Sequence, residues 1–155
     1  MDLIVGEYKV KNKEDLKNLF IELQAYEKTI WSDRAESTEE FVAKFIDELL
    51  EEVKMKNGKV YLAFENEVPV GFIAGYIERD SENNSDYFRI DSLVVKRDFR
   101  NKGVGTRLVE KIGEYAKSTG QSKVGLGVLV GNFSAYDYYK RLGFKDYGIE
   151  MIKNL

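Results

Sequence analysis

The sequence contains neither cysteine nor histidine among its 155 residues. The absence of cysteine excludes disulfides, thiol nucleophiles and thiolate metal sites. The absence of histidine removes the most common general base and the most common metal ligand, so Ser-His-Asp and Cys-His catalytic arrangements are excluded too. A carboxylate-only magnesium or calcium site is chemically conceivable, but no stretch has the spacing of a calcium-binding loop. We therefore expect no metal.

Long hydrophobic runs and clusters of basic residues are also absent. No segment approaches the roughly 18 apolar residues that a membrane-spanning helix needs. The opening Met1-Asp2 leads into a charged, alternating segment that does not resemble a signal peptide. No basic cluster with interleaved aromatic residues suggests nucleic-acid binding. We expect a single cytoplasmic domain over residues 1–155, with neither membrane nor nucleic acid as a partner.

The charges that are present are distributed unevenly along the chain. Residues 1–56 carry 14 acidic and 9 basic side chains, and the remaining residues carry 13 acidic and 15 basic ones. An acidic first third could attract a cationic substrate, and the mildly basic remainder suits an anionic cofactor. The alternative is that two amphipathic helices simply have solvated acidic faces.

The spacing of apolar residues predicts an α/β domain with a mixed sheet, because hairpins supply antiparallel strand pairs and a strand–helix–strand unit at 87–130 supplies a parallel pair. Asn12 and the pair Ser37 and Glu40 are the expected N-terminal caps of the first two helices. The predicted strands are 3–10, 59–65, 68–79, 87–95, 123–130 and a closing pair within 144–153. The predicted helices are one after Asn12 with an apolar stripe through Leu23, one from Ser37 with a stripe through Val53, 103–119 and 132–142.

The most informative stretch is a glycine loop between a buried strand and a helix. It begins after Leu93-Val94-Val95 and reads Arg100-Asn101-Lys102-Gly103-Val104-Gly105-Thr106, an R-x-x-G-x-G pattern. The first turn of a helix has unpaired N–H groups and partial positive charge, so it is suited to an anion. A Walker loop and a dinucleotide fingerprint are both excluded, the latter because Leu108 stands where its third glycine belongs. The alternative is that the two glycines have only a structural role where the chain enters the helix.

A second segment, from Asn132 to Phe144, reads N-x-x-A-x-x-x-Y-x-x-x-G-F. Together the two segments resemble the GNAT superfamily of N-acetyltransferases. The resemblance covers roughly the last 85 residues motif by motif and the whole chain in its order of elements. It implies an acyl-CoA N-acyltransferase fold, with a mostly antiparallel central sheet that splays into a V and is flanked by helices.

The resemblance also implies a site for acetyl-CoA, the acyl donor. The loop Arg100–Thr106 would wrap the pyrophosphate, and Asn132 would contact the cofactor. The strand before the loop would be broken by a bulge, so that Leu93, Val94 and Val95 line the pantetheine arm. A backbone N–H near Val94 would face the thioester oxygen.

In the same family a tyrosine at the position of Tyr139 serves as the general acid. A phenol with an ordinary pKa near 10 can protonate the departing thiolate. The alternative is that Tyr139 only packs with Ala135 and Leu142 on its helix face. We predict that Tyr136 and Tyr138 are structural.

The general base is less well defined by the sequence. Many relatives place a glutamate on the strand before the Asn motif, where this chain has Gly127. We predict Asp91, on the argument that alternation puts it on the same strand face as Leu93. Glu78 and loss of the amine proton to water are the alternatives.

The resemblance assigns the acceptor wall to the first two helices. Tyr26, Glu27, Trp31 and Asp33 would suit a cationic amine there, although the two aromatic residues could instead close the core. The predicted activity is direct acetyl transfer to an amine of a small molecule or peptide. Two alternatives stand: a non-catalytic acetyl-CoA-binding module, and a transferase that uses another acyl-CoA. Similar proteins are often homodimers, but no residue pattern specifies an interface.

Overall fold

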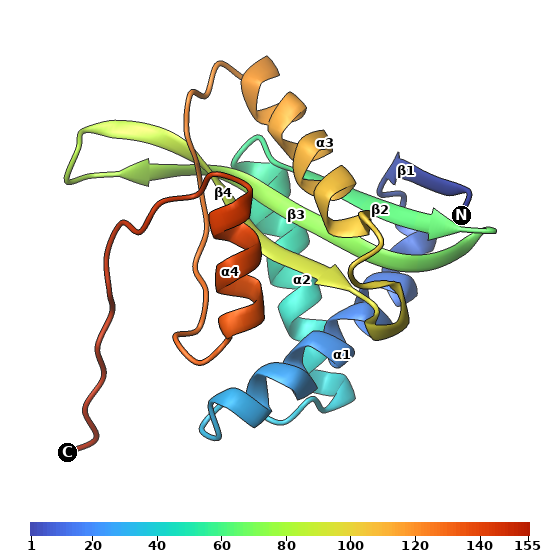
Figure 1. The fold of residues 1–155 in the computed structure, drawn as a ribbon, viewed down its shortest axis with the longest axis horizontal. Helices are drawn as coiled ribbons and strands as arrows, with labels where there is room; N and C mark the ends of the chain where they lie inside the picture. The colour runs from blue at the N-terminus through green and yellow to red at the C-terminus, as the bar shows by residue number, and fades with distance from the viewer.

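The computed structural model describes residues 1–155 and contains one five-stranded sheet with helices on both faces (Figure 1). The strands follow one another across the sheet in the order β1-β2-β3-β4-β5, antiparallel except for the parallel pair β4 and β5. The elements are β1 (Leu3–Glu7), η1 (Val10–Asn12), α1 (Lys13–Ile30), α2 (Glu39–Met55), β2 (Lys59–Glu65), β3 (Val68–Asp80), β4 (Ser85–Val95), η2 (Arg97–Phe99), α3 (Val104–Ser118), β5 (Val124–Gly125) and α4 (Phe133–Arg141). The predicted mixed sheet and its antiparallel majority are confirmed.

Two hydrophobic clusters hold the layers together. Helices α1 and α2 bury Leu16, Phe20 and Ile46 against one face of the sheet, together with Phe72 and Val94 from the strands. On the opposite face, α3 buries one apolar stripe against β1–β4, which includes Val104, Leu108, Ile112 and Ala116. This stripe recurs every four residues and so lies along one side of the helix.

The sheet opens between β4 and β5. Only Phe88 and Arg89 of β4 pair with β5, through Val124 and Gly125. Strand β4 continues to Val95 and keeps β3 as its only neighbour. The predicted strand 123–130 is therefore wrong in length: after Gly125 the chain leaves the ladder, and a strand requires a partner for its backbone groups. The gap is the V-shaped splay that the family resemblance implied.

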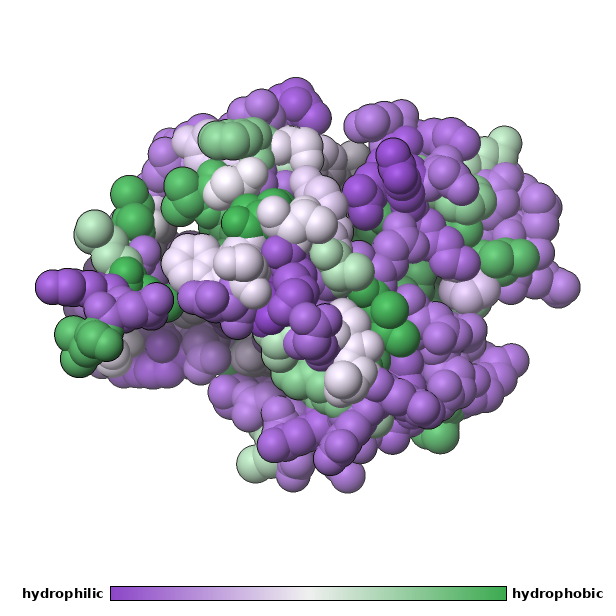
Figure 2. All heavy atoms as spheres, turned by 90° about the horizontal axis from the view of Figure 1, so that it is seen from below, coloured by the Kyte–Doolittle hydropathy of each residue, from purple (hydrophilic) through white to green (hydrophobic).

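The expected closing strand pair within 144–153 is also wrong. This segment has no regular secondary structure and extends away from the body (Figure 1). Its apolar residues are exposed, among them Tyr147, Ile149, Met151 and Ile152. Hydrophobic residues gather at the left margin of Figure 2, on the side from which this segment extends in Figure 1. Apolar periodicity alone does not make a strand, because a strand also needs a neighbouring strand to pair its backbone groups.

The hairpin turn lies where the sequence predicted it, whereas only one of the two predicted helix caps is at its predicted position. Asn66 and Glu67 both have positive φ, of 48° and 66°, as a tight hairpin turn requires. The predicted cap Ser37 is wrong: the hydroxyl of the next residue, Thr38, accepts the N–H of Phe41 at 3.1 Å. Asn12 occupies the cap position of α1, but its side chain accepts the Lys9 N–H, at 3.3 Å, and caps no helical N–H group.

Candidate active site

A β-bulge interrupts β4 at Asp91. Ala74 of β3 pairs with Ser92, and the next residue, Gly75, pairs with Ile90, so Asp91 has no partner in the ladder. A bulge inserts one residue and reverses the alternation of side chains beyond it. Ile90 and Leu93 consequently both pack in the cluster under α3, whereas Val94 packs in the cluster under α1 and α2.

The bulge overturns the alternation argument for Asp91. The hydroxyl of Tyr76, which belongs to the cluster under α1 and α2, donates to Asp91 Oδ2 at 3.1 Å. Asp91 therefore lies on the face of Tyr76 and Val94, opposite the face of Leu93. The Ser92 hydroxyl donates to its other oxygen at 2.9 Å. Burial, with Asp91 beside it, raises the pKa of Tyr76, so this phenol remains a hydrogen-bond donor.

The rival base, Glu78, lies at the far end of β3, where it pairs with Tyr87 of β4. Its carboxylate is 3.5 Å from the ammonium of Lys56, at the end of α2. Four residues of extended strand separate Tyr87 from Asp91, roughly 13 Å at 3.3 Å per residue. Glu78 is therefore an ion-pairing residue at the margin of the sheet, remote from the bulge.

The loop after β4 leads to a helix start that no side chain caps. Gly103 has φ of 81° at the N-cap of α3, a left-handed conformation that favours glycine, and a Cβ there would meet only open space. The first N–H groups of a helix have no intrahelical partners and so can receive an external anion. The predicted phosphate loop thus has the required backbone form.

Helix α1 and the end of β4 hold this loop in place. The Arg97 N–H donates to Glu22 Oε1 at 2.8 Å, and Arg100 Nε donates to the Val95 carbonyl at 3.0 Å. The guanidinium of Arg100 also lies 5.4 Å from the ring centroid of Tyr26. The exposed Lys102 lies on the same loop, 5.4 Å from the ring of Phe99. Two cations therefore stand beside the open helix start.

Tyr138 is part of the wall at this helix start. Its hydroxyl is 3.3 Å from Oγ1 of Thr106, and a Cβ on Gly105 would come within 3.0 Å of the same hydroxyl. Glycine at 105 therefore makes room for the hydroxyl of Tyr138. We predicted a structural role for Tyr138 from the sequence, and no residue pattern placed it beside the loop.

Asn132 joins α4 to α1. It is buried at the N-cap of α4, where its Oδ1 accepts the Ala135 N–H at 3.3 Å and the Tyr26 hydroxyl at 3.4 Å. Because the Tyr26 ring also contacts Arg100, this contact connects the glycine loop with the helix that carries Tyr139. The two sequence motifs therefore meet around Tyr26.

Tyr139 is largely enclosed within α4 and its surroundings. Its ring lies edge-on to Phe144, with centroids 5.7 Å apart, and 5.5 Å from the ring of Tyr138. Burial raises the pKa of Tyr139 to about 12, and Tyr138 and Glu27 add to the effect. The phenol is therefore protonated at neutral pH, the state that a proton donor needs.

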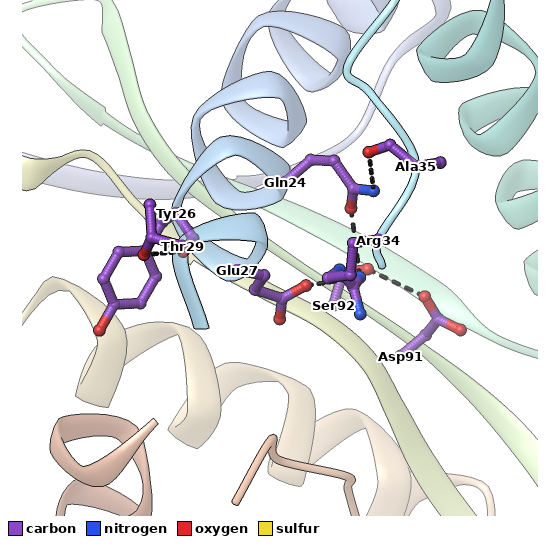
Figure 3. A network of polar contacts seen from close by, with 8 residues as sticks. All are labelled: Gln24, Tyr26, Glu27, Thr29, Arg34, Ala35, Asp91 and Ser92. Carbon is purple, nitrogen blue, oxygen red and sulfur yellow. Dashed lines mark hydrogen bonds and ion pairs between the residues drawn. The ribbon is translucent and has the colours of Figure 1, made fainter. Parts of the chain in front are cut away.

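Glu27 and Arg34 belong to a network of polar contacts beside α1 (Figure 3). Glu27 Oε2 is 2.5 Å from Nη2 of Arg34, which also donates to Gln24 Oε1 at 3.2 Å. Burial raises the pKa of Glu27, and Arg34 opposes that shift. Trp31 and Asp33 are exposed and, unlike Tyr26 and Glu27, take no part in these contacts. Sequence reasoning did not find Arg34, because a loop residue has no periodicity.

No helix has both the length and the apolar character to cross a membrane. No three acidic side chains gather where they could hold a metal ion.

The chain belongs to the acetyltransferase (GNAT) family, whose sequence profile matches residues 21–144. Over 82 residues it is 42% identical to an uncharacterized N-acetyltransferase of Methanocaldococcus jannaschii, an alignment that covers 52% of this chain and 36% of that protein. It is 37% identical over 57 residues to the thialysine N-epsilon-acetyltransferase of Bos taurus, covering 37% of this chain and 34% of the relative. The chain thus spans about a third of the length of these curated relatives.

The fold comparison extends over the whole chain. A solved Pyrococcus furiosus structure named as an acetyl transferase superposes with a TM-score of 0.80, at 22% identity, covering 99% of this chain and 100% of that one. At this identity the similarity establishes the fold, with its helices on both faces of one sheet.

Proposed function

We propose that this protein is an acetyl-CoA-dependent N-acetyltransferase that moves the acetyl group directly to an amine. One observation carries the proposal: beyond its bulge β4 has no partner on the β5 side, and it leads into a helix start that no side chain caps. An extended ligand with a diphosphate at one end fits this combination. The strand edge can pair with amide groups of the ligand, and the helix start can hold its anion.

The proposed donor site uses residues that the structure brings together. The backbone of Leu93, Val94 and Val95 would bind the pantetheine arm of acetyl-CoA. The loop from Arg100 through Asn101, Lys102, Gly103, Val104 and Gly105 to Thr106 would hold the diphosphate, with Asn132 nearby at the start of α4. When bound, the donor supplies a thioester whose acyl carbon is open to attack.

Proton transfer then falls to two residues of this chain. As the amine nitrogen bonds to the acyl carbon and the carbon–sulfur bond breaks, Tyr139 gives its proton to the sulfur. The raised pKa of Tyr139 favours its protonated form. A backbone N–H near Val94 would stabilise negative charge on the acyl oxygen.

Asp91 is the proposed acceptor of the amine proton, directly or through water. The bulge projects its carboxylate from the sheet at the point where the splay begins, between Tyr76 and Ser92. Glu78 is the weaker candidate, because Lys56 neutralises it at the margin of the sheet. Attack by an amine on the thioester needs no acetyl-enzyme intermediate, which agrees with the absence of cysteine.

The test is release of free CoA from acetyl-CoA in the presence of a panel of primary amines. We expect turnover by the wild type and a loss of about 10²- to 10⁴-fold in Tyr139→Phe. Tyr136→Phe is the matched control, since Tyr136 is exposed on the same helix and bonds Asp146. Equal rates in wild type and Tyr139→Phe would remove Tyr139 from the mechanism. Cofactor binding without turnover of any amine would contradict the catalytic assignment.

A further inference from the structure

Arg89 stands next to the proposed reaction centre and is not used by the proposed chemistry. It precedes Asp91 by two residues on β4, before the bulge, so the two side chains lie on the same face of the strand. Their Cα atoms are about 6.5 Å apart at the rise of an extended strand. Tyr76, which donates to Asp91, is also the direct cross-strand neighbour of Arg89.

The guanidinium of Arg89 has no carboxylate partner. Arg89 takes part in none of the ion pairs within 4.0 Å, although its side chain is only partly exposed. The carboxylate of Asp91 is occupied by Tyr76 and Ser92. Other arginines near the sheet are matched, for example Arg34 with Glu27 and Arg79 with Asp86. The side chain of Arg89 bonds Tyr87, and the carboxylate of Asp91 attracts it without forming a direct ion pair. A partly buried guanidinium with no direct ion pair can still gain from an anion that binds it.

Two glycines on the β5 side give the β4 side chains room to reach across. A Cβ on Gly125 would lie 2.9 Å from the ring of Tyr87, and a Cβ on Gly127 would lie 4.0 Å from Nη2 of Arg89. Gly127 has no side chain, and the guanidinium of Arg89 from β4 therefore lies beside its backbone. The sequence shows that a carboxylate is missing at Gly127, and the structure places the positive charge of Arg89 beside it.

The charges around the proposed site are therefore separated in space. Asp91 and Glu27 offer negative charge, the first at the bulge and the second beside Tyr139. Arg89 offers positive charge one strand step away from Asp91. A plain diamine would place its second ammonium toward this guanidinium, which is unfavourable. An amine that also carries an anionic group matches both charges.

We propose that the acceptor is a small amine bearing a carboxylate or a phosphate, and that Arg89 binds this anionic group while the amine faces Asp91. The inference rests on the proposed acetyl transfer. Arginine suits the role because its planar guanidinium forms paired hydrogen bonds with either anion.

The test compares acceptors that differ only in charge. 6-Aminohexanoate and 6-aminohexanamide each have one primary amine, and 1,5-diaminopentane adds a second cation; 5-aminopentyl phosphate replaces the carboxylate by a phosphate on the same five-carbon spacer. We expect wild-type kcat/KM to be at least about 10-fold higher for 6-aminohexanoate or 5-aminopentyl phosphate than for the neutral amide, as one charge-assisted hydrogen-bonding contact would give. Which of the two anions is preferred identifies the source of the anionic group.

Arg89→Gln should remove that preference. We expect kcat/KM for the preferred anionic acceptor to fall about 10- to 100-fold, mainly through KM, with less than about 3-fold change for the neutral amide. Arg89→Lys should recover part of the loss. Arg79→Gln is the control, because Arg79 is exposed and pairs with Asp86.

The outcomes separate the two proposals. Wild-type preference for the diamine or the neutral amide would overturn this inference and leave acetyl transfer intact. An equal loss in Arg89→Gln for charged and neutral acceptors would also overturn it, since it would show a structural role. No turnover of any amine would overturn the proposed function, and this inference with it.

Discussion

Tyr76 and Asp91 face each other across β3 and β4, and the phenol donates a 3.1 Å hydrogen bond to the carboxylate of the bulged residue. Tyr76 is buried among the side chains under α1 and α2. The contact therefore fixes the direction of Asp91 from within the core. It also explains why Asp91 points away from Leu93, which sequence alternation had placed on the same face.

Tyr76→Phe should reduce stability modestly and leave the fold intact. The hydroxyl is the only group removed, and one hydrogen bond to a charged acceptor contributes about 1.5–3 kcal/mol. We expect the free energy of unfolding in urea to fall by about that amount, with an unchanged denaturant dependence. Ser92→Ala removes the second donor to Asp91. Additive losses in the double variant would contradict a shared role of the two donors in holding this carboxylate.

Tyr139 should give the protein a distinct loss of stability in strong alkali. Its folded pKa is raised to about 12, above the ordinary value of 10.0. Because the folded state holds this proton more tightly, the associated stability is complete below pH 10 and is lost as the pH rises through 12. We expect the melting temperature to fall less steeply between pH 10 and 12 in Tyr139→Phe than in the wild type. Parallel curves would show that the phenol is not protected by burial.

Gly105→Ala should weaken coenzyme binding. The new Cβ would lie 3.0 Å from the Tyr138 hydroxyl at the start of α3, where the diphosphate is proposed to bind. We expect the dissociation constant for CoA, measured calorimetrically, to rise at least about 10-fold, as for loss of one charge-assisted contact. Gly113→Ala is the control on the same helix, since nothing lies within 4 Å of its Cβ position.

Gly113→Ala should also increase the stability of the protein. Glycine inside a helix is less stable than alanine by about 0.5–1 kcal/mol. Gly113→Ala should therefore raise the melting temperature while CoA binding stays unchanged. Equal weakening of CoA binding in both variants would point to a general effect on α3 and against a ligand site at its start.

Removal of residues 148–155 should have little effect on stability. None of these residues belongs to a helix or strand, and all are exposed. We expect the melting temperature to change by less than about 2 °C, a surface-level effect. A large destabilisation would indicate that the segment pairs as a strand, as its apolar pattern had predicted.

The local elements were largely predictable because they depend on neighbours in the chain. The stripe of Val104, Leu108, Ile112 and Ala116 specified α3, and Asn66-Glu67 specified the hairpin turn. The strand ends were harder to predict. β5 ends at Gly125 because it diverges from β4, and no residue in 126–130 indicates this divergence. The sequence could not show whether Ser37 or Thr38 caps α2, because both have a hydroxyl. The backbone geometry places the hydroxyl of Thr38 within reach of the Phe41 N–H.

By itself the sequence determined which chemistry the chain cannot perform, since it contains no histidine and no cysteine. Its glycine loop before a helix and Tyr139 in a second motif predict anion binding by the backbone and proton donation by a phenol. Only the tertiary structure decided where the charges face. The bulge moved Asp91 to the other face of β4, and the divergence of β5 placed Arg89 beside Gly127. Both depend on how neighbouring strands pair, and pairing joins residues that are distant in the chain.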